Sequence, residues 1–105
     1  MTVTDLDPAV AWYTKLLAAE PDARPMDGLV EWHLAPTFGL QVWSEADRAG
    51  RSAMIVDHSD LDELAGHLDR AGIQHGGVQD VTASRILPVT DPDGNRIVFT
   101  GPFGT

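Results

Sequence analysis

The chain has 105 residues, which is enough for one domain and too few for two independent hydrophobic cores. Its 43% hydrophobic and 22% charged residues are typical of a globular protein, and the absence of cysteine excludes disulfides, thiolate metal sites and cysteine nucleophiles. The formal charge of −9 repels phosphate backbones and so disfavours nucleic-acid binding. The sequence contains neither a signal-peptide pattern nor an apolar run of about 20 residues. We therefore expect a cytoplasmic protein without nucleic-acid or membrane partners.

The first half of the chain predicts a helix followed by strands. The helix is expected to begin at Asp7-Pro8, because aspartate is a strong N-cap and proline fits the first turn. It is expected to end at Glu20-Pro21, since the residue before proline avoids the α conformation. Residues 21–28 contain two prolines and a glycine, so any strand there is short and lies at a sheet edge. The apolar stripe of the helix consists of Val10, Tyr13, Leu16 and Leu17.

The pattern predicts that two longer strands follow and pair as a hairpin. Residues 29–35 alternate, with Val30, Trp32 and Leu34 on one face and Glu31 and His33 on the other. Residues 38–43 predict the partner strand. The polar segment 44–51 then forms the boundary between two parts of the chain.

The second half repeats the same order of elements. Residues 53–56 predict a short buried strand, and Ser59 or Asp60 is expected to cap a second helix that ends before Gly72. A strand near residues 85–89, a turn at residues 91–94 and a last strand at residues 96–100 complete the chain. The apolar stripe of the second helix consists of Leu61, Leu64, Ala65, Leu68 and Ala71.

The two halves also match in sequence. Asp5-Leu6-Asp7 opens the first helix, and Asp60-Leu61-Asp62 opens the second, 55 positions later. An internal repeat of this length indicates a duplicated supersecondary unit. We therefore expect a single domain, 1–105, with one module at about residues 1–48 and a second at about residues 51–103.

Three segments resemble a known superfamily: DLDPAVAWYTKLL, DLDELAGHLDRAGI and, most specifically, the ending DPDGNRIVF. They are similar to the vicinal oxygen chelate proteins, which include glyoxalase, bleomycin-resistance and extradiol-dioxygenase proteins. The resemblance implies an α+β fold in which two βαβββ modules curve around a cup-shaped ligand cavity. Only Met1–Thr4 precede Asp5, so the first strand is expected to be truncated, and either a partner chain covers its edge or the native start lies upstream. The family commonly has glycine where this chain has Ala18.

The resemblance also implies where a catalytic metal would bind. Metal-dependent members use four side chains, usually His and Glu, one from each of four strands that line the cup. The first position would precede Met1, and the other three fall on Gln41, near Ala53 and on Val98. Because a metal needs three or four positioned ligands, we expect neither a metal nor another cofactor.

Alternation places other candidate residues on the wall of the cup. Glu31 and His33 share one strand face, and Gln41 and Trp43 share a face of the neighbouring strand. The pair Glu31 and His33 could do acid–base work or bind a metal in a manner unlike the family's, or it could form an ordinary solvated face. Trp43 is expected to stack a ligand, whereas Trp32 is expected in the core. Arg96 and Val98 are two residues apart on the last strand, so alternation would direct both side chains to the cup. Arg96 would then be an anion anchor.

These observations predict a metal-free small-molecule-binding protein, a homodimer that sequesters a neutral or cationic compound as bleomycin-resistance proteins do. The alternative is a metal-dependent or metal-independent isomerase, lyase or dioxygenase of the same superfamily, and a regulatory domain without a ligand is a third possibility. The predicted ligand-binding residues are Glu31, His33, Gln41, Trp43, Arg96 and Val98.

Overall fold

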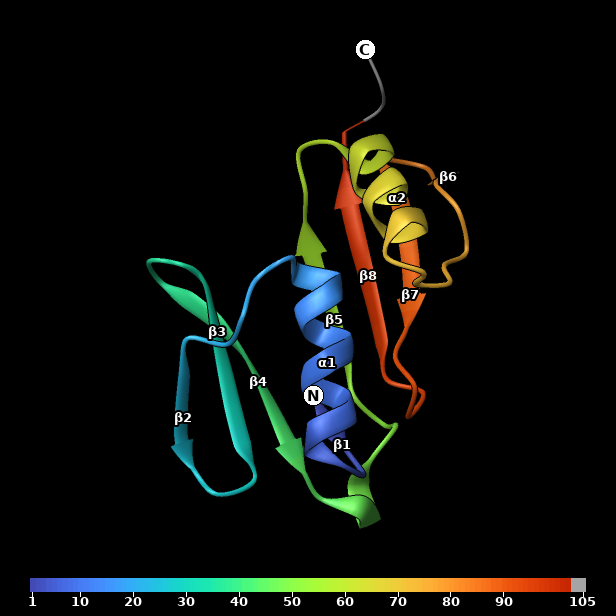
Figure 1. Ribbon diagram of the computed structural model, residues 1–105. Helices are drawn as coiled ribbons and strands as arrows, with labels where there is room; N and C mark the ends of the chain where they lie inside the picture. The colour runs from blue at the N-terminus through green and yellow to red at the C-terminus, as the bar shows by residue number, and fades with distance from the viewer. Residues whose placement is uncertain (103–105) are drawn as a thin grey trace.

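The computed structural model describes residues 1–102, so residue 103, the predicted end of the second module, lies outside the described part. Two four-stranded sheets stand side by side, and both helices cover the same side of them (Figure 1). The first sheet has the order β1-β4-β3-β2 and the second the order β5-β8-β7-β6. The equivalent order confirms the predicted α+β fold of two βαβββ modules. The strands are β1 (Thr2–Val3), β2 (Ala23–Met26), β3 (Leu29–Ala35), β4 (Phe38–Ser44), β5 (Ala53–Asp57), β6 (Gln79–Asp80), β7 (Arg85–Thr90) and β8 (Arg96–Gly101).

The first helix, α1 (Leu6–Leu17), begins earlier and ends earlier than the sequence predicts. Its N-cap is Asp5 rather than Asp7, and the Asp5 side chain makes no capping hydrogen bond. Pro8 therefore lies at the third helical position, which is tolerated because the first four N–H groups of a helix have no partner within it. The helix ends three residues before Pro21, at Ala18, and not at the proline itself.

Ala18 has a left-handed backbone conformation, with φ of 54° and ψ of 34°. It is the one non-glycine residue with positive φ among residues 1–102. Helices commonly end in this conformation, but they usually place glycine there, because a Cβ atom is strained in it. This conformation explains why glycine is common at this position in the family that the chain resembles. Ala18 adopts the same conformation with strain.

We expect Ala18→Gly to raise the free energy of unfolding by about 0.5–1 kcal/mol, since relief of strain exceeds the added entropy of the unfolded chain. Thermal or urea denaturation measures the difference. The matched control is Ala19→Gly, which removes a methyl group one residue later, where φ is not positive, and should lower stability slightly. A loss of stability in Ala18→Gly would contradict the assignment of strain.

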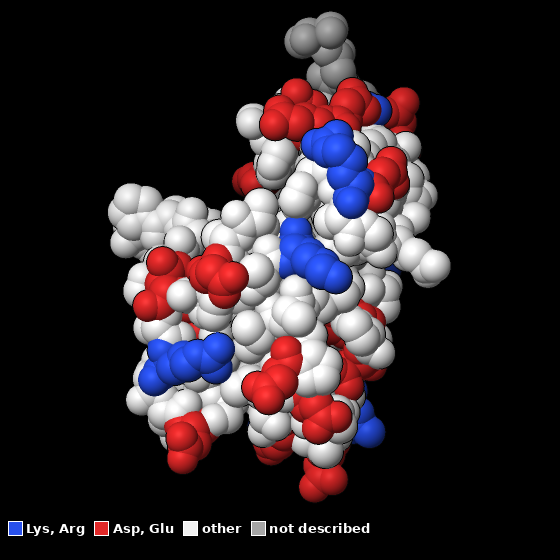
Figure 2. Space-filling model, viewed as in Figure 1, with Lys and Arg blue, Asp and Glu red and all other residues white. Residues whose placement is uncertain are grey.

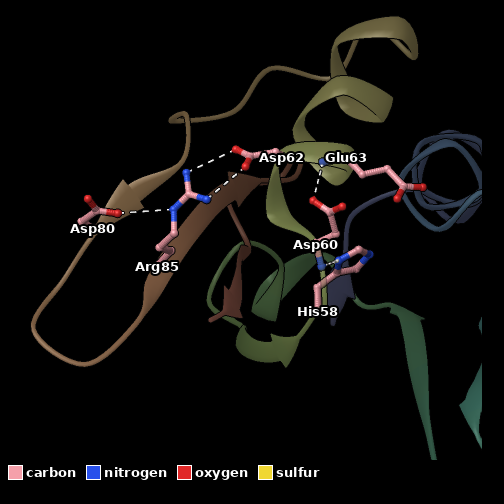
Figure 3. Close-up of polar contacts among 6 residues, drawn as sticks. All are labelled: His58, Asp60, Asp62, Glu63, Asp80 and Arg85. Atoms are coloured by element: carbon pink, nitrogen blue, oxygen red, sulfur yellow. Dashed lines mark hydrogen bonds and ion pairs between the residues drawn. The ribbon is translucent and has the colours of Figure 1, made fainter. Parts of the chain in front are cut away.

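The second helix, α2 (Leu61–Arg70), begins as the sequence predicts. Asp60 is its N-cap, and its Oδ1 accepts a hydrogen bond from the main-chain N–H of Glu63 at 3.0 Å. Figure 3 shows Arg85 of β7 between two aspartates: its guanidinium donates to both Oδ atoms of Asp62 at 3.1 and 3.2 Å and lies 3.3 Å from Asp80. Through these contacts, Arg85 connects both α2 and the two-residue strand β6 to β7. Sequence reasoning missed β6, because Gln79 and Asp80 are polar and exposed.

One hydrophobic core lies between the helices and the covered faces of both sheets. Its largest fully buried side chains include Trp32 and Tyr13, as expected. The opposite faces of the sheets carry no helix among the described residues (Figure 1). The prediction that β5 is buried is therefore wrong: Ala53 is exposed and Ile55 is 74% exposed, since only the alternate residues Met54 and Val56 pack against the core.

The two modules are joined by a buried polar network at the turn between β7 and β8, which we call the junction network: Tyr13, Asp91 and Asn95. Asp91 Oδ2 accepts hydrogen bonds from the Tyr13 hydroxyl and the Asn95 amide, both at 2.7 Å. Asp91 Oδ1 accepts from the main-chain N–H groups of Asp93 and Asn95. Asp91 is 4% exposed and Asn95 is fully buried. Four donors compensate for the burial of this carboxylate.

Asn95 connects the junction network to both sheets. Its amide donates to the Thr2 carbonyl of β1 at 2.8 Å, and its Oδ1 accepts from the Ser52 N–H, just before β5, at 2.8 Å. Thr2 and Ser52 also contact each other, because the Thr2 N–H donates to Ser52 Oγ at 3.1 Å. The network therefore fixes the place where the two sheets adjoin.

Candidate functional site

A groove with a volume of about 770 Å³ lies where the open face of the first sheet meets β5. Its lining comes from the N-terminal end of the chain, from β3 and β4, and from the start of β5. The groove therefore crosses the junction between the modules. Side chains that line it include Glu31, His33, Phe38, Gln41, Trp43 and Met54.

The polar centre of the groove is a cluster of three side chains, which we call the acceptor cluster: Glu31, His33 and Gln41. Glu31 and His33 are two residues apart on β3, and Gln41 is directly opposite Glu31 on β4, so all three share one face. Glu31 Oε1 lies 2.7 Å from His33 Nε2, and Glu31 Oε2 accepts from the Gln41 amide at 2.8 Å.

The cluster favours the ionised form of Glu31. The hydrogen bond from Gln41, followed by that from His33, lowers the pKa of the Glu31 carboxyl below its ordinary value of 4.5. The carboxylate is therefore charged throughout the neutral and mildly acidic range. No Lys or Arg forms an ion pair with it in the described part of the chain.

Apolar side chains flank the acceptor cluster. Trp43 is 37% exposed and Phe38 is 53% exposed, which are high values for large hydrophobic residues. Phe38 lies near the tip of the β3–β4 hairpin, which projects from the body of the molecule (Figure 1). Met54 of β5 lines the groove from the second module. An ionised carboxylate between exposed aromatic rings is an arrangement that can bind an organic ligand.

Met1 also lines the groove. The Met1 amino group donates to the Gln41 carbonyl oxygen at 2.7 Å. Burial lowers the pKa of this amine, and Asp91 opposes the shift only in part. Its positive charge is thus weakened and already engaged by a main-chain oxygen.

The structure brings four of the six predicted site residues together and separates the other two. Glu31, His33, Gln41 and Trp43 all line the groove. Arg96 and Val98 do not line it; they lie in register with Ala53 and Ile55, one strand farther from β4. Alternation correctly indicates their sheet face, but β5 stands between β8 and the groove.

Sequence reasoning missed the contributions of Phe38 and Met54. Phe38 was assigned only to a strand, and its position beside a hairpin tip is the one signal that could have shown its exposure. Met54 has the parity of the covered face of β5, yet it lines the groove beside Ser52 and Ala53. No sequence pattern shows how two separate sheets meet.

The residues present do not fit the metal site of catalytic relatives. Among residues 1–102, no group of three or more His, Asp or Glu side chains is placed to hold a metal ion. The Gln41 amide nitrogen is directed toward Glu31, and Ala53 and Val98 offer no ligand atom in their side chains.

Charge is distributed as the composition suggests. On the face seen in Figure 2, acidic side chains gather toward both ends and basic side chains stand apart from one another. Sixteen acidic against seven basic residues produce this surface. Within residues 1–102, no helix is long and apolar enough to cross a membrane.

The fold is shared with solved structures of known proteins. A glyoxalase/bleomycin resistance protein from Catenulispora acidiphila DSM 44928 is 27% identical, with a TM-score of 0.88 over 96% of this chain and 92% of that one. A lactoylglutathione lyase from Agrobacterium tumefaciens is 18% identical, with a TM-score of 0.78 over 96% and 88%. TnmS3, an antibiotic-binding protein from Streptomyces sp. CB03234, is 19% identical, with a TM-score of 0.75 over 97% and 92%.

No protein-family model matches the sequence, and no curated protein matches it significantly. The assignment therefore depends on structure. The duplicated βαβββ modules, the ending from Asp91 to Ile97 and the similarity to the Catenulispora protein agree with one another. Together they show that the chain has the fold of glyoxalase/bleomycin resistance proteins, in agreement with its resemblance to the vicinal oxygen chelate superfamily.

Proposed function

We propose that this protein binds a small organic molecule in the groove without a metal ion and sequesters it. The observation that carries the proposal is the hydrogen bond from the Gln41 amide to Glu31. It fixes the Gln41 side chain to Glu31 within a groove flanked by Trp43 and Phe38, while the family positions at Ala53 and Val98 offer no ligand atom in their side chains. TnmS3, the antibiotic-binding protein with the same fold, supports a binding role of this kind.

The test combines metal analysis with ligand binding. We expect purified protein to contain no stoichiometric zinc, iron, nickel or manganese, and Trp43→Ala to weaken binding of flat aromatic compounds by roughly 2- to 30-fold, the loss of one stacking contact. Trp12→Ala is the control, because Trp12 does not line the groove. One equivalent of metal per chain, or equal weakening in both variants, would contradict the proposal.

A second candidate function is metal-independent acid–base catalysis. Glu31 and His33, 2.7 Å apart, could together remove and return a proton of a bound substrate. The two functions differ in the fate of the ligand. A compound recovered unchanged supports sequestration, whereas conversion that is lost in His33→Gln supports an isomerase or lyase.

We also propose that the protein is a homodimer. Ile55 is 74% exposed on the open face of the second sheet. Val98, its partner on the neighbouring strand β8, is half-buried. A sheet face with exposed apolar residues is commonly covered by another surface. Light scattering should give twice the chain mass of 11.3 kDa, and Ile55→Asp should lower that mass. A monomer at micromolar concentration would refute the dimer.

A further inference from the structure

The acceptor cluster determines which hydrogen-bonding groups the groove offers to a ligand. Gln41 donates through Nε2 to Glu31, so its carbonyl oxygen Oε1 is directed away from that contact and can only accept. A neutral His33 that donates Nε2–H to Glu31 presents Nδ1 as a second acceptor. Both orientations follow from the single carboxylate between them.

The carboxylate itself retains capacity to accept. Its two oxygens offer about four lone-pair directions, of which Gln41 and His33 occupy two. The Glu31 side chain is 23% exposed, so a ligand can reach it. The polar centre of the groove therefore presents three acceptors that require hydrogen-bond donors.

Charge favours the same class of ligand. Glu31 has no Lys or Arg partner in the described part of the chain, and Arg96 lies outside the groove. The Met1 amino group, which belongs to a residue lining the groove, already donates to the main-chain carbonyl of Gln41. An anion would meet an unbalanced carboxylate, whereas a cation would balance it.

We infer that the ligand carries a planar cationic group with a fork of N–H donors, an amidinium or guanidinium, on a flat aromatic body. The fork donates to Glu31 and to Gln41 Oε1 or His33 Nδ1, and the aromatic body stacks on Trp43. This inference rests on the proposed function, because it names the chemistry of the molecule bound in the same groove.

Three probes of the same shape test the inference: benzamidine, benzamide and benzoate. Binding is followed at pH 8 through the indole N–H signal of Trp43 in nuclear magnetic resonance, assigned with Trp43→Phe. We expect benzamidine to bind at least about tenfold more tightly than benzoate, since charge-assisted hydrogen bonds replace charge repulsion, with benzamide between them.

Net charge alone would also attract a cation, so a matched pair of variants separates the two effects. Glu31→Gln and Glu20→Gln each remove one negative charge, but exposed Glu20 does not line the groove. Glu31→Gln should weaken benzamidine binding about tenfold and abolish the preference over benzoate. Glu20→Gln should change neither.

The possible failures are distinguishable. If the three probes bind in a Trp43-dependent manner but benzoate binds as tightly as benzamidine, or Glu31→Gln and Glu20→Gln behave alike, the inference is wrong and the proposed function stands. If no probe shifts the Trp43 signal, both are overturned.

Discussion

Asp91→Ala should strongly destabilise the folded protein. It removes the acceptor for the Tyr13 hydroxyl, the Asn95 amide and two main-chain N–H groups, all in a buried region. Buried donors without partners cost about 1–3 kcal/mol each, so we expect a total loss of about 3–5 kcal/mol. For a domain of this size that lowers the melting temperature by roughly 12 °C or more.

The matched control for this substitution is Asp93→Ala in the same turn. Asp93 is only half-buried and accepts one side-chain hydrogen bond, from Thr4 at 2.7 Å. Its loss should cost no more than about 1 kcal/mol. Similar melting temperatures for Asp91→Ala and wild-type protein would show that the junction network does not stabilise the fold.

The second large effect is expected in alkaline solution, at Tyr13. Burial, followed by the hydrogen bond to Asp91, raises the pKa of the Tyr13 hydroxyl above its ordinary value of 10. The unfolded chain releases this proton near pH 10, whereas the folded protein retains it. The contribution of Tyr13 is therefore fully present below pH 10, and stability falls above it by about 1.4 kcal/mol per pH unit.

Tyr13 is the only tyrosine in the chain, which makes the measurement specific. Phenolate absorbance should remain absent above pH 10 and should appear together with the loss of secondary structure. In Tyr13→Phe, this component of the alkaline destabilisation should disappear, although the variant is less stable at neutral pH. A reversible phenolate signal from the folded protein would contradict the buried hydrogen bond.

Local patterns predict much of the fold. The alternation of residues 29–35 identifies β3 and its covered face, with Val30 and Trp32 in the core. Asp60 and the leucine stripe identify α2. These signals succeed because a single helix or strand shows its buried face through the spacing of its own side chains.

Contacts between elements that are distant in sequence account for the differences between the predicted and the observed structure. Helix α1 begins shortly after β1, with Asp5 as its N-cap in place of Asp7. The strand β5 looks apolar in sequence, yet Ile55 is exposed because nothing in residues 1–102 covers that face. β6 forms only because it pairs with β7 and Arg85 contacts Asp80.

The candidate site likewise contains residues that local patterns predict and residues whose positions depend on tertiary contacts. Parity along β3 and β4 predicts that Glu31, His33, Gln41 and Trp43 share a wall, since cross-strand neighbours follow from one hairpin. The positions of Arg96 and Val98 relative to the groove depend on how two sheets adjoin. That arrangement is fixed by Asn95 between Thr2 and Ser52, contacts more than 40 residues apart in the chain.

The central claim is that the groove binds an organic cation without a metal ion. A crystal structure of the protein with benzamidine, recorded with anomalous data, tests it most directly. We expect the ring against Trp43, the amidinium at Glu31 and Gln41, and no anomalous metal peak at Gln41, Ala53 or Val98. A metal ion bound at Gln41, or benzamidine density only outside the groove, would contradict it.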